Sequence, residues 1–165
     1  MNTEFLVKKA YARMRLLHSA AKYTKNKHDL KSIYYTYIRP VIEQSATVWH
    51  SSLTEENIAD LNRVQKCAVR VIMGENYTDY KKSLDILDIE TLESRRDNLC
   101  KKMAMKTVQI PSIKEMFPLR KENRNEKRRH TNKYHINKAN TTRYKKSAIP
   151  YLQNILNIQE KKRKN

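Results

Sequence analysis

One glycine among 165 residues is the feature that most restricts what this chain can fold into. Tight β-turns and hairpin loops depend on glycine for positive φ angles, and Gly74 alone can supply it. There are four prolines, while Leu, Ile, Lys, Glu, Arg, Ala and Met are plentiful, a composition that favours helices. The sequence therefore predicts an all-α protein: an irregular bundle of about five helices, a basic extended arm and a short C-terminal helix.

Apolar residues recur at spacings of three and four along much of the chain, as they do on the buried face of a helix. The segments with this pattern are residues 5–23, 29–49, a third from Ser52 or Thr54 to Gly74, 80–87, 91–107 and 149 onward. Pro40 lies inside the second segment, where we expect a kink or a break into two shorter helices. Gly74 stands where a left-handed residue would end the third.

Aromatic side chains are concentrated in the second segment, which contains Tyr34, Tyr35, Tyr37 and Trp49. They can line a nucleic-acid groove or fill a core, and their spacing beside aliphatic residues favours the core, with Tyr35 as the most exposed. Cys67 and Cys100 stand far apart within apolar helical patterns. We expect both to be buried, reduced thiols, which points to an intracellular protein.

Positive charge is concentrated near the C-terminus. The net charge is +18, and residues 120–146 hold eleven Lys and Arg against two acids. We therefore divide the chain into a helical domain (1–119), a basic arm or loop (120–146) and a C-terminal helix with a basic tail (147–165). The like charges of so dense a cluster repel one another unless a polyanion neutralises them, and nucleic acid is the commonest such partner. The alternative is a disordered basic linker.

The nucleic-acid contacts predicted from this stretch are basic residues for phosphates and two tyrosines for base stacking. They are Arg120, Lys121, Arg124, Lys127, Arg128, Arg129, Lys133, Tyr134, Arg143, Tyr144, Lys145 and Lys146. Four basic residues of the first helix extend this set: Lys8, Lys9, Arg13 and Arg15.

Signatures of catalysis and of metal binding are missing from the sequence. One glycine cannot form a phosphate-binding P-loop, and His130 and His135 have no Cys or acidic partner at ligand spacing. The nearest cluster of acids, Asp85, Asp88 and Glu90, fits solvated helix ends better than a two-metal site. A Cys67 or Cys100 nucleophile acting with His50 stays open, although both thiols lie on apolar faces. We expect no catalytic residue, metal or cofactor.

No apolar run approaches the roughly 20 residues that span a bilayer, and the N-terminus lacks the apolar core of a signal peptide. These features predict a soluble protein without a membrane partner, located in the nucleus or cytoplasm.

Several strings occur in the order found in reverse transcriptases of LINE-type (non-long-terminal-repeat) retrotransposons, which this chain resembles. They are IYYTYIRPVIEQSATVWH at 33–50, RVQKCAVRVIMG at 63–74, LDIETLE at 87–93 with Arg95 and Arg96, MFP at 116–118 and RYKKSAIPYL at 143–152. The resemblance is to the thumb and the basic C-terminal extension, which hold the duplex of template RNA and growing DNA. It implies RNA/DNA, or RNA, as the partner.

In that family the polymerase site lies in the palm, within an aromatic-x-Asp-Asp motif, and this chain contains no Asp-Asp pair. The resemblance therefore implies a non-catalytic fragment of an RNA-directed DNA polymerase, from a truncated element copy or an excised piece, that is inactive alone. Two alternatives remain: a helical protein-interaction module that docks on the absent palm or another partner, and an autonomous enzyme.

Overall fold

The computed structural model describes residues 3–120, 132–136 and 138–164. Every element with defined bounds in these residues is a helix, and the β-type pairing found among them is an isolated antiparallel bridge between Leu119 and Tyr134. The prediction of an all-α fold is confirmed. No helix in the described ranges combines the length and apolarity needed to cross a bilayer.

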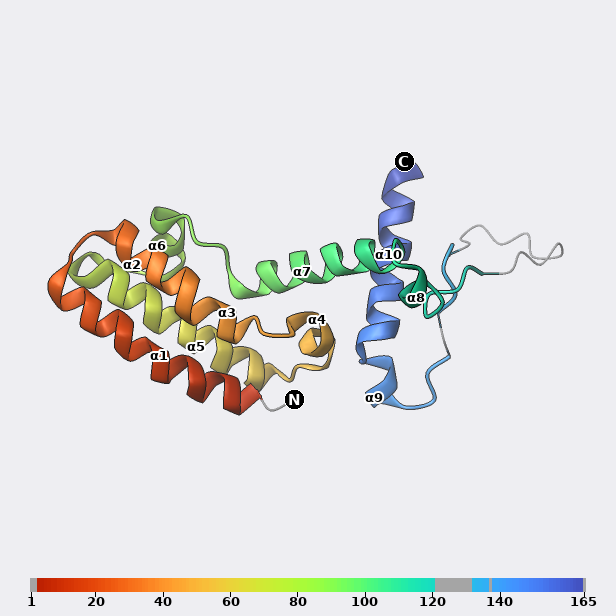
Figure 1. The fold of residues 1–165 in the computed structure, drawn as a ribbon, viewed down its shortest axis with the longest axis horizontal. Coiled ribbons are helices and arrows are strands. Elements are labelled where there is room, and N and C mark those ends of the chain that lie inside the picture. Colours follow the sequence, from red (N-terminus) through yellow and green to blue (C-terminus); the bar gives the residue numbers. More distant parts are fainter. Residues whose placement is uncertain (1–2, 121–131, 137, 165) are drawn as a thin grey trace. The chain divides into compact units, whose positions relative to one another are not determined.

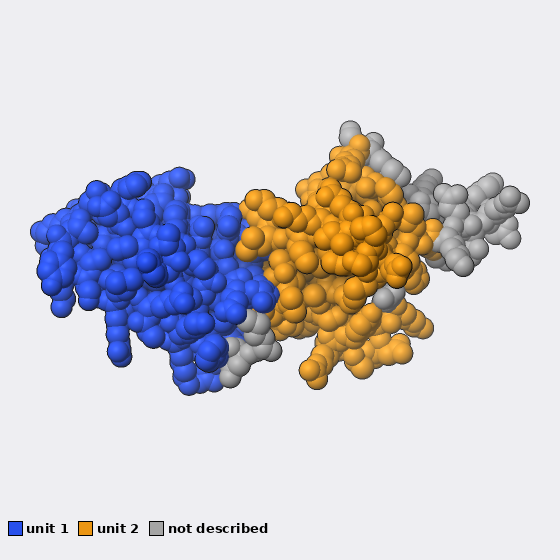
Figure 2. All heavy atoms as spheres, viewed as in Figure 1, with its two compact units in different colours: residues 1–46, 53–96 blue, residues 47–52, 97–165 orange. Residues whose placement is uncertain are grey.

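The chain forms two compact units, coloured separately in Figure 2. Unit 1 contains residues 1–46 and 53–96, and unit 2 contains residues 47–52 and 97–165. This division differs from the boundary predicted at residue 119. Helical periodicity runs unbroken through residues 96 and 97, so the sequence pattern gives no sign that the packing partners change there.

Unit 1 is built on α1, a composite second helix and α5, which pack side by side (Figure 1). Its elements are α1 (Thr3–Tyr23), α2 (Lys27–Ile33), the π-helical η1 (Tyr34–Ile38), α3 (Arg39–Ile42), α5 (Glu55–Met73), the 3₁₀ turn η3 (Gly74–Asn76) and α6 (Tyr80–Leu87). The apolar residues whose spacings of four and three predict this helix are buried: Leu6, Ala10, Met14 and Leu17. The segment between α3 and α5 holds α4 (Ala46–Trp49) and the 3₁₀ turn η2 (His50–Ser52).

The helix that contains Pro40 is not broken at the proline. Helical structure is continuous from Lys27 to Ile42, and the turn before Pro40 is π-helical, with the Arg39 N–H donating to the carbonyl of Tyr34. Proline has no N–H and crowds the preceding turn, and the wider π turn accommodates both effects. Of the two expected outcomes, a kink or a break, the break does not occur, and the helix changes register at the π turn.

This change of register also alters which aromatic residues are buried. Tyr34 and Trp49 are buried, as predicted, but Tyr37 is 51% exposed while Tyr35 is half-buried. The expectation that Tyr35 is the most exposed is therefore wrong. One extra residue in the π turn leaves Ile38, rather than Tyr37, facing the core.

Both ends of α5 are set by local chemistry. Thr54, one of the two predicted N-caps, accepts a hydrogen bond from the Asn57 N–H at 3.2 Å. At the other end Gly74 has φ +55° and ψ −128° and stops the helix. Side chains of L-residues are strained at this φ, so the single glycine of the chain stands where a positive φ is needed.

Replacing Gly74 by alanine should lower the free energy of unfolding of unit 1 by about 1–2 kcal/mol, because alanine is strained at positive φ. The added Cβ has no atom within 4 Å, so this cost comes from the backbone alone. Urea denaturation followed by circular dichroism measures it. Glu75→Ala, at an exposed neighbour, is the control, and equal stability of the two variants would contradict the prediction.

Unit 2 contains most of α7 (Leu92–Thr107), with α8 (Pro111–Lys114), α9 (Thr142–Lys145) and α10 (Ala148–Lys164). Its core cluster is Cys100, Ala104, Phe117, Tyr134, Leu152, Ile155 and Leu156. Cys100 and Ala104 hold the inward positions of α7, and Met103 is 37% exposed. The predicted short C-terminal helix is 17 residues long, and it includes the residues predicted as a basic tail.

Candidate nucleic-acid interface

The positive charge of the chain is divided unequally between the two units. Unit 2 has nineteen Lys and Arg against five acids, a net charge of +14, whereas unit 1 has sixteen against twelve, a net charge of +4. Acids of unit 1 pair with its bases, as Glu43 does with Arg39 at 3.6 Å and Arg95 at 3.2 Å. The charge excess is therefore a property of unit 2.

Helix α9 and its C-cap residue, Lys146, present four of the predicted contact residues. Arg143, Tyr144, Lys145 and Lys146 all have exposed side chains. The Thr141 hydroxyl caps the helix by accepting from the Tyr144 N–H at 3.2 Å. At the other end the Ser51 hydroxyl donates to the carbonyl of Lys146 at 2.7 Å, which fastens α9 to the 47–52 segment of the same unit. Three cations and a phenol ring are thus displayed on a fixed turn.

The two ends of the basic stretch are paired with each other. The Arg120 N–H donates to the carbonyl of Lys133, and the His135 N–H donates to the carbonyl of Pro118, each at 2.9 Å. These bonds flank the bridge between Leu119 and Tyr134. The residues on either side of the 121–131 stretch are therefore held next to each other.

Helix α10 holds this loop in place through side chains one turn apart. Asn157, which is buried, accepts from the Tyr134 N–H at 2.9 Å and donates to the Tyr134 carbonyl at 3.1 Å. Gln153 donates to the carbonyl of Met116 at 3.3 Å. Segments before and after residues 121–131 are thus bound to one face of α10.

A hollow of about 260 Å³ lies where the loop begins and ends, lined by Arg120, Asn132, Tyr134, His135 and Ile136. Its lining includes a guanidinium, a side-chain amide and an imidazole. These groups are hydrogen-bond donors of the kind that contact phosphate oxygens.

Tyr134 does not have the role predicted for it. Its ring is only 8% exposed and belongs to the core of unit 2, so it is not presented for stacking on a base. The alternation of basic and aromatic residues suggested a surface position, but the bridge to Leu119 turns this ring inward. Lys133 beside it is exposed and pairs with Glu160 at 3.1 Å. Five predicted contacts lie outside the described residues: Lys121, Arg124, Lys127, Arg128 and Arg129.

The structure adds basic side chains that were not among the predicted contacts. Lys101, Lys102 and Lys106 are exposed on α7, while Cys100 and Ala104 of the same helix are buried. Near the end of α10, Lys161, Lys162 and Arg163 are exposed too. Helical periodicity could have identified the α7 set, because its lysines avoid the buried positions.

The basic residues of α1 belong to unit 1 and serve partly internal roles. Lys8 pairs with Glu4 at 2.7 Å, and Arg13 donates to the carbonyl of Tyr37 at 2.9 Å. They are not part of the charge excess of unit 2.

A polar cluster in unit 2 joins His50 to Asp97 and Tyr151. The His50 Nε2 lies 2.8 Å from the Asp97 Oδ1, and the Tyr151 hydroxyl donates to that same oxygen at 3.5 Å. Burial, with the nearby Asp97 carboxylate as a smaller cause, raises the pKa of Tyr151 to about 12. Cys100, considered as a nucleophile with His50, is fully buried, so we interpret the cluster as an anchor for the 47–52 segment.

The acids considered for two-metal chemistry are at the surface. Asp85, Asp88 and Glu90 have exposed side chains, and Asp88 is the left-handed C-cap of α6, with φ 50°. Within the described ranges no group of three or more His, Cys, Asp or Glu side chains is placed to hold a metal ion.

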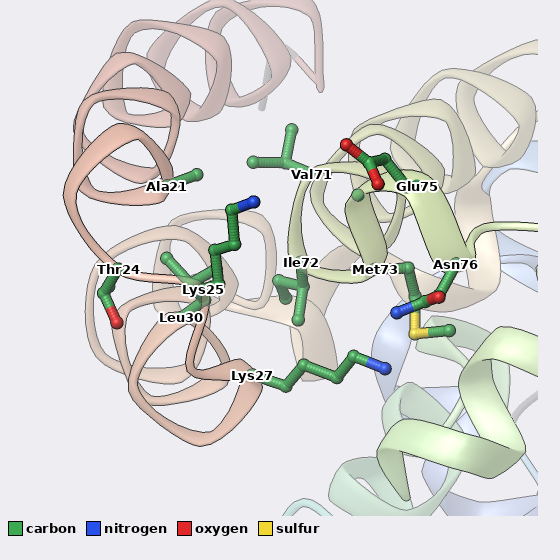
Figure 3. Close-up of a pocket in the computed structure, with 11 residues that line it drawn as sticks. Ala21, Thr24, Lys25, Lys27, Leu30, Val71, Ile72, Met73, Glu75 and Asn76 are labelled. Atoms are coloured by element: carbon green, nitrogen blue, oxygen red, sulfur yellow. The ribbon is translucent and has the colours of Figure 1, made fainter.

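Unit 1 has a pocket of about 200 Å³ where α1 and α5 end (Figure 3). Leu30, Ile72 and Met73 give it an apolar floor, and Lys25 and Lys27 extend across it from the α1–α2 side. None of the predicted nucleic-acid contacts lines it.

Asn157→Leu should release the loop, because the N–H and carbonyl of Tyr134 would both lose their buried partner. Leaving two backbone groups unsatisfied costs about 2–3 kcal/mol. Faster amide hydrogen exchange at Tyr134 and His135 would reveal it. Asn154→Leu, at an exposed position of the same helix, is the matched control. Identical exchange in the two variants would show that the hydrogen bonds between Asn157 and Tyr134 do not hold this segment.

Comparison with known proteins leaves the family open: no family model, curated protein or solved structure matches this chain significantly.

Proposed function

We propose that this chain is a non-catalytic nucleic-acid-binding module that grips phosphate backbones through unit 2. The single observation that carries the proposal is the net charge of +14 on this unit, with the basic side chains of α9 exposed. A polyanion releases its condensed counterions when such a surface binds, which makes association favourable at low salt.

The resemblance to LINE-type reverse transcriptases makes the bound nucleic acid more specific. We propose that the chain corresponds to the thumb and C-terminal extension of such an enzyme and holds an RNA/DNA template–primer duplex. Lys and Arg side chains that contact phosphates carry no sequence information. Binding is therefore expected to depend weakly on sequence, and the exposed Tyr144 is the candidate for stacking on a base.

Fluorescence anisotropy with a labelled RNA/DNA hybrid, across a range of salt concentrations, tests this proposal. Each neutralised phosphate contributes roughly 0.7–0.9 to the slope of log K against log salt, so six contacts predict a slope of about −5. Double-stranded DNA and single-stranded RNA of equal length establish the preferred nucleic acid. Weak association that is insensitive to salt would rule the proposal out.

A primer-extension assay tests whether the module is non-catalytic. With the hybrid, deoxynucleotides and Mg²⁺ present, the isolated chain is expected to leave the primer unextended, since the Asp-Asp pair of a polymerase palm is missing from the sequence. Template-dependent extension would overturn this part of the proposal and leave the binding result unaffected.

A second candidate function is a protein-interaction module that docks on a polymerase palm or another partner. The observation that favours it is a set of large apolar side chains exposed on α1, including Phe5 at 61% and Tyr23 at 91%. This function is compatible with the first, because the two surfaces belong to different units.

A further inference from the structure

Helix α1 carries a second apolar line besides its buried face, formed by Phe5, Ala12, Leu16 and Tyr23 and here called the α1 stripe. Phe5 is 61% exposed, Leu16 46% and Tyr23 91%, and Ala12 is exposed as well. The spacings of seven, four and seven residues place these side chains within about 40° of one another around a helix of 3.6 residues per turn. The α1 stripe is therefore a straight seam on the side opposite the core.

Basic residues border this seam on both sides. Lys8, Arg15 and Lys22, seven residues apart and all exposed, follow one edge. Lys9 lies on the other edge, with its ammonium 5.9 Å from the centre of the Phe5 ring. Glu4 is the sole acid within the sequence of α1, and it is paired with Lys8 at 2.7 Å.

We propose that the α1 stripe docks an amphipathic helix of a partner protein whose apolar seam is bordered by acidic residues. In the heptad register that these spacings set, Phe5 and Ala12 take d positions and Leu16 and Tyr23 take a positions, while Lys9, at the edge of the seam, and Ser19 hold the remaining two. Lys8, Arg15 and Lys22 take g positions, where they match glutamates that flank the seam of a partner helix. With 21 residues, α1 is about 30 Å long, enough for a partner of five to six turns. This inference is independent of the proposed nucleic-acid function.

Charge and geometry disfavour the other occupants. In a dimer formed through α1, the five basic residues of one copy would face the five of the other, so repulsion between like charges would oppose self-association. Helices that lie in a membrane surface have a broad apolar face, whereas this seam covers about 40° of the circumference. Nucleic acid would suit the cations but would bury Leu16 and Ala12 against polar groups.

The test uses the full chain and three fluorescein-labelled, 21-residue helical peptides at nanomolar concentration. The first has leucine at positions a and d and glutamate at e and g. The second has lysine in place of glutamate, and the third has glutamate but asparagine in place of leucine. The third has the same charge as the first, so it measures non-specific attraction to the cations of unit 2.

Fluorescence anisotropy should show tight binding of the first peptide only. Leu16→Ser should weaken that binding about tenfold or more, as truncation at the centre of an interface does. Ile86→Ser, at a 63% exposed position on α6, should leave it unchanged. Circular dichroism verifies that both variants fold. Equal affinity for the first and third peptides, or no effect of Leu16→Ser, would overturn the proposal.

Charge reversal provides a second readout. The triple variant Lys8→Glu, Arg15→Glu, Lys22→Glu should bind the glutamate-flanked peptide more weakly and the lysine-flanked peptide more tightly. An unchanged preference would contradict the proposal. Two further results would also overturn it: a Leu16-dependent dimer in sedimentation velocity, and Leu16-dependent binding to vesicles that contain phosphatidylserine.

Discussion

Replacing Arg143, Lys145 and Lys146 by alanine is expected to weaken binding to an RNA/DNA hybrid roughly 100- to 500-fold in 0.1 M salt. Each phosphate contact contributes roughly 0.7–0.9 to the salt exponent, which at this concentration is about a factor of five to eight. The three side chains are exposed on α9 and its C-cap, so their removal leaves the core of unit 2 intact. The slope of log K against log salt should become shallower by about 2–3.

The matched control removes three positive charges from unit 1. Lys22, Lys25 and Lys82 are exposed, and their replacement by alanine lowers the net charge by the same amount. If the charge excess of unit 2 holds the nucleic acid, this control should lose little affinity. Equal losses would show that total charge, and not the surface of unit 2, governs binding.

Replacing Gln65 by leucine is expected to lower the free energy of unfolding of unit 1 by about 2–4 kcal/mol. Gln65 is fully buried in α5 and uses both ends of its amide. Its Nε2 donates to the carbonyl of Glu90 at 2.9 Å, and its Oε1 accepts from the Tyr80 hydroxyl at 2.7 Å and from the Leu92 N–H at 3.2 Å. Leucine fills a similar volume but leaves these groups without their partner.

Chemical denaturation followed by circular dichroism measures this loss, and Asn62→Leu on the same helix is the control. Asn62 is half-buried, and among the described residues its side chain makes no hydrogen bond, so its replacement should change stability by less than about 0.5 kcal/mol. Equal stability of Gln65→Leu and this control would contradict the prediction. It would mean that the Glu90 carbonyl, the Leu92 N–H and the Tyr80 hydroxyl find other hydrogen-bond partners.

Much of the candidate interface could be predicted from the sequence. Density of charge identified the basic stretch, and Arg143, Tyr144, Lys145 and Lys146 are exposed where this pattern placed them. Tyr134 was misjudged because the sequence contains no sign of its bridge to Leu119 or of its pairing with Asn157, 23 residues away. The hydrogen bonds that Gln153 and Asn157 of α10 make to Met116 and Tyr134 were missed for the same reason. In the sequence, these two residues look like ordinary polar residues of a surface helix.

The sequence by itself determined the all-α class, the approximate limits of the main helices, the stop at Gly74 and the place of the charge excess. These are local properties: spacing of three and four, a cap or a glycine, and the count of charges within a segment. Tertiary structure alone decided that α7 changes from one unit to the other, that a π turn accommodates Pro40 and that Tyr134 is buried. The change of unit and the burial of Tyr134 depend on contacts between residues far apart in the chain, and packing selects such contacts from many that local patterns permit equally. The π turn is a local response to Pro40, but helical periodicity alone does not distinguish it from a kink or a break.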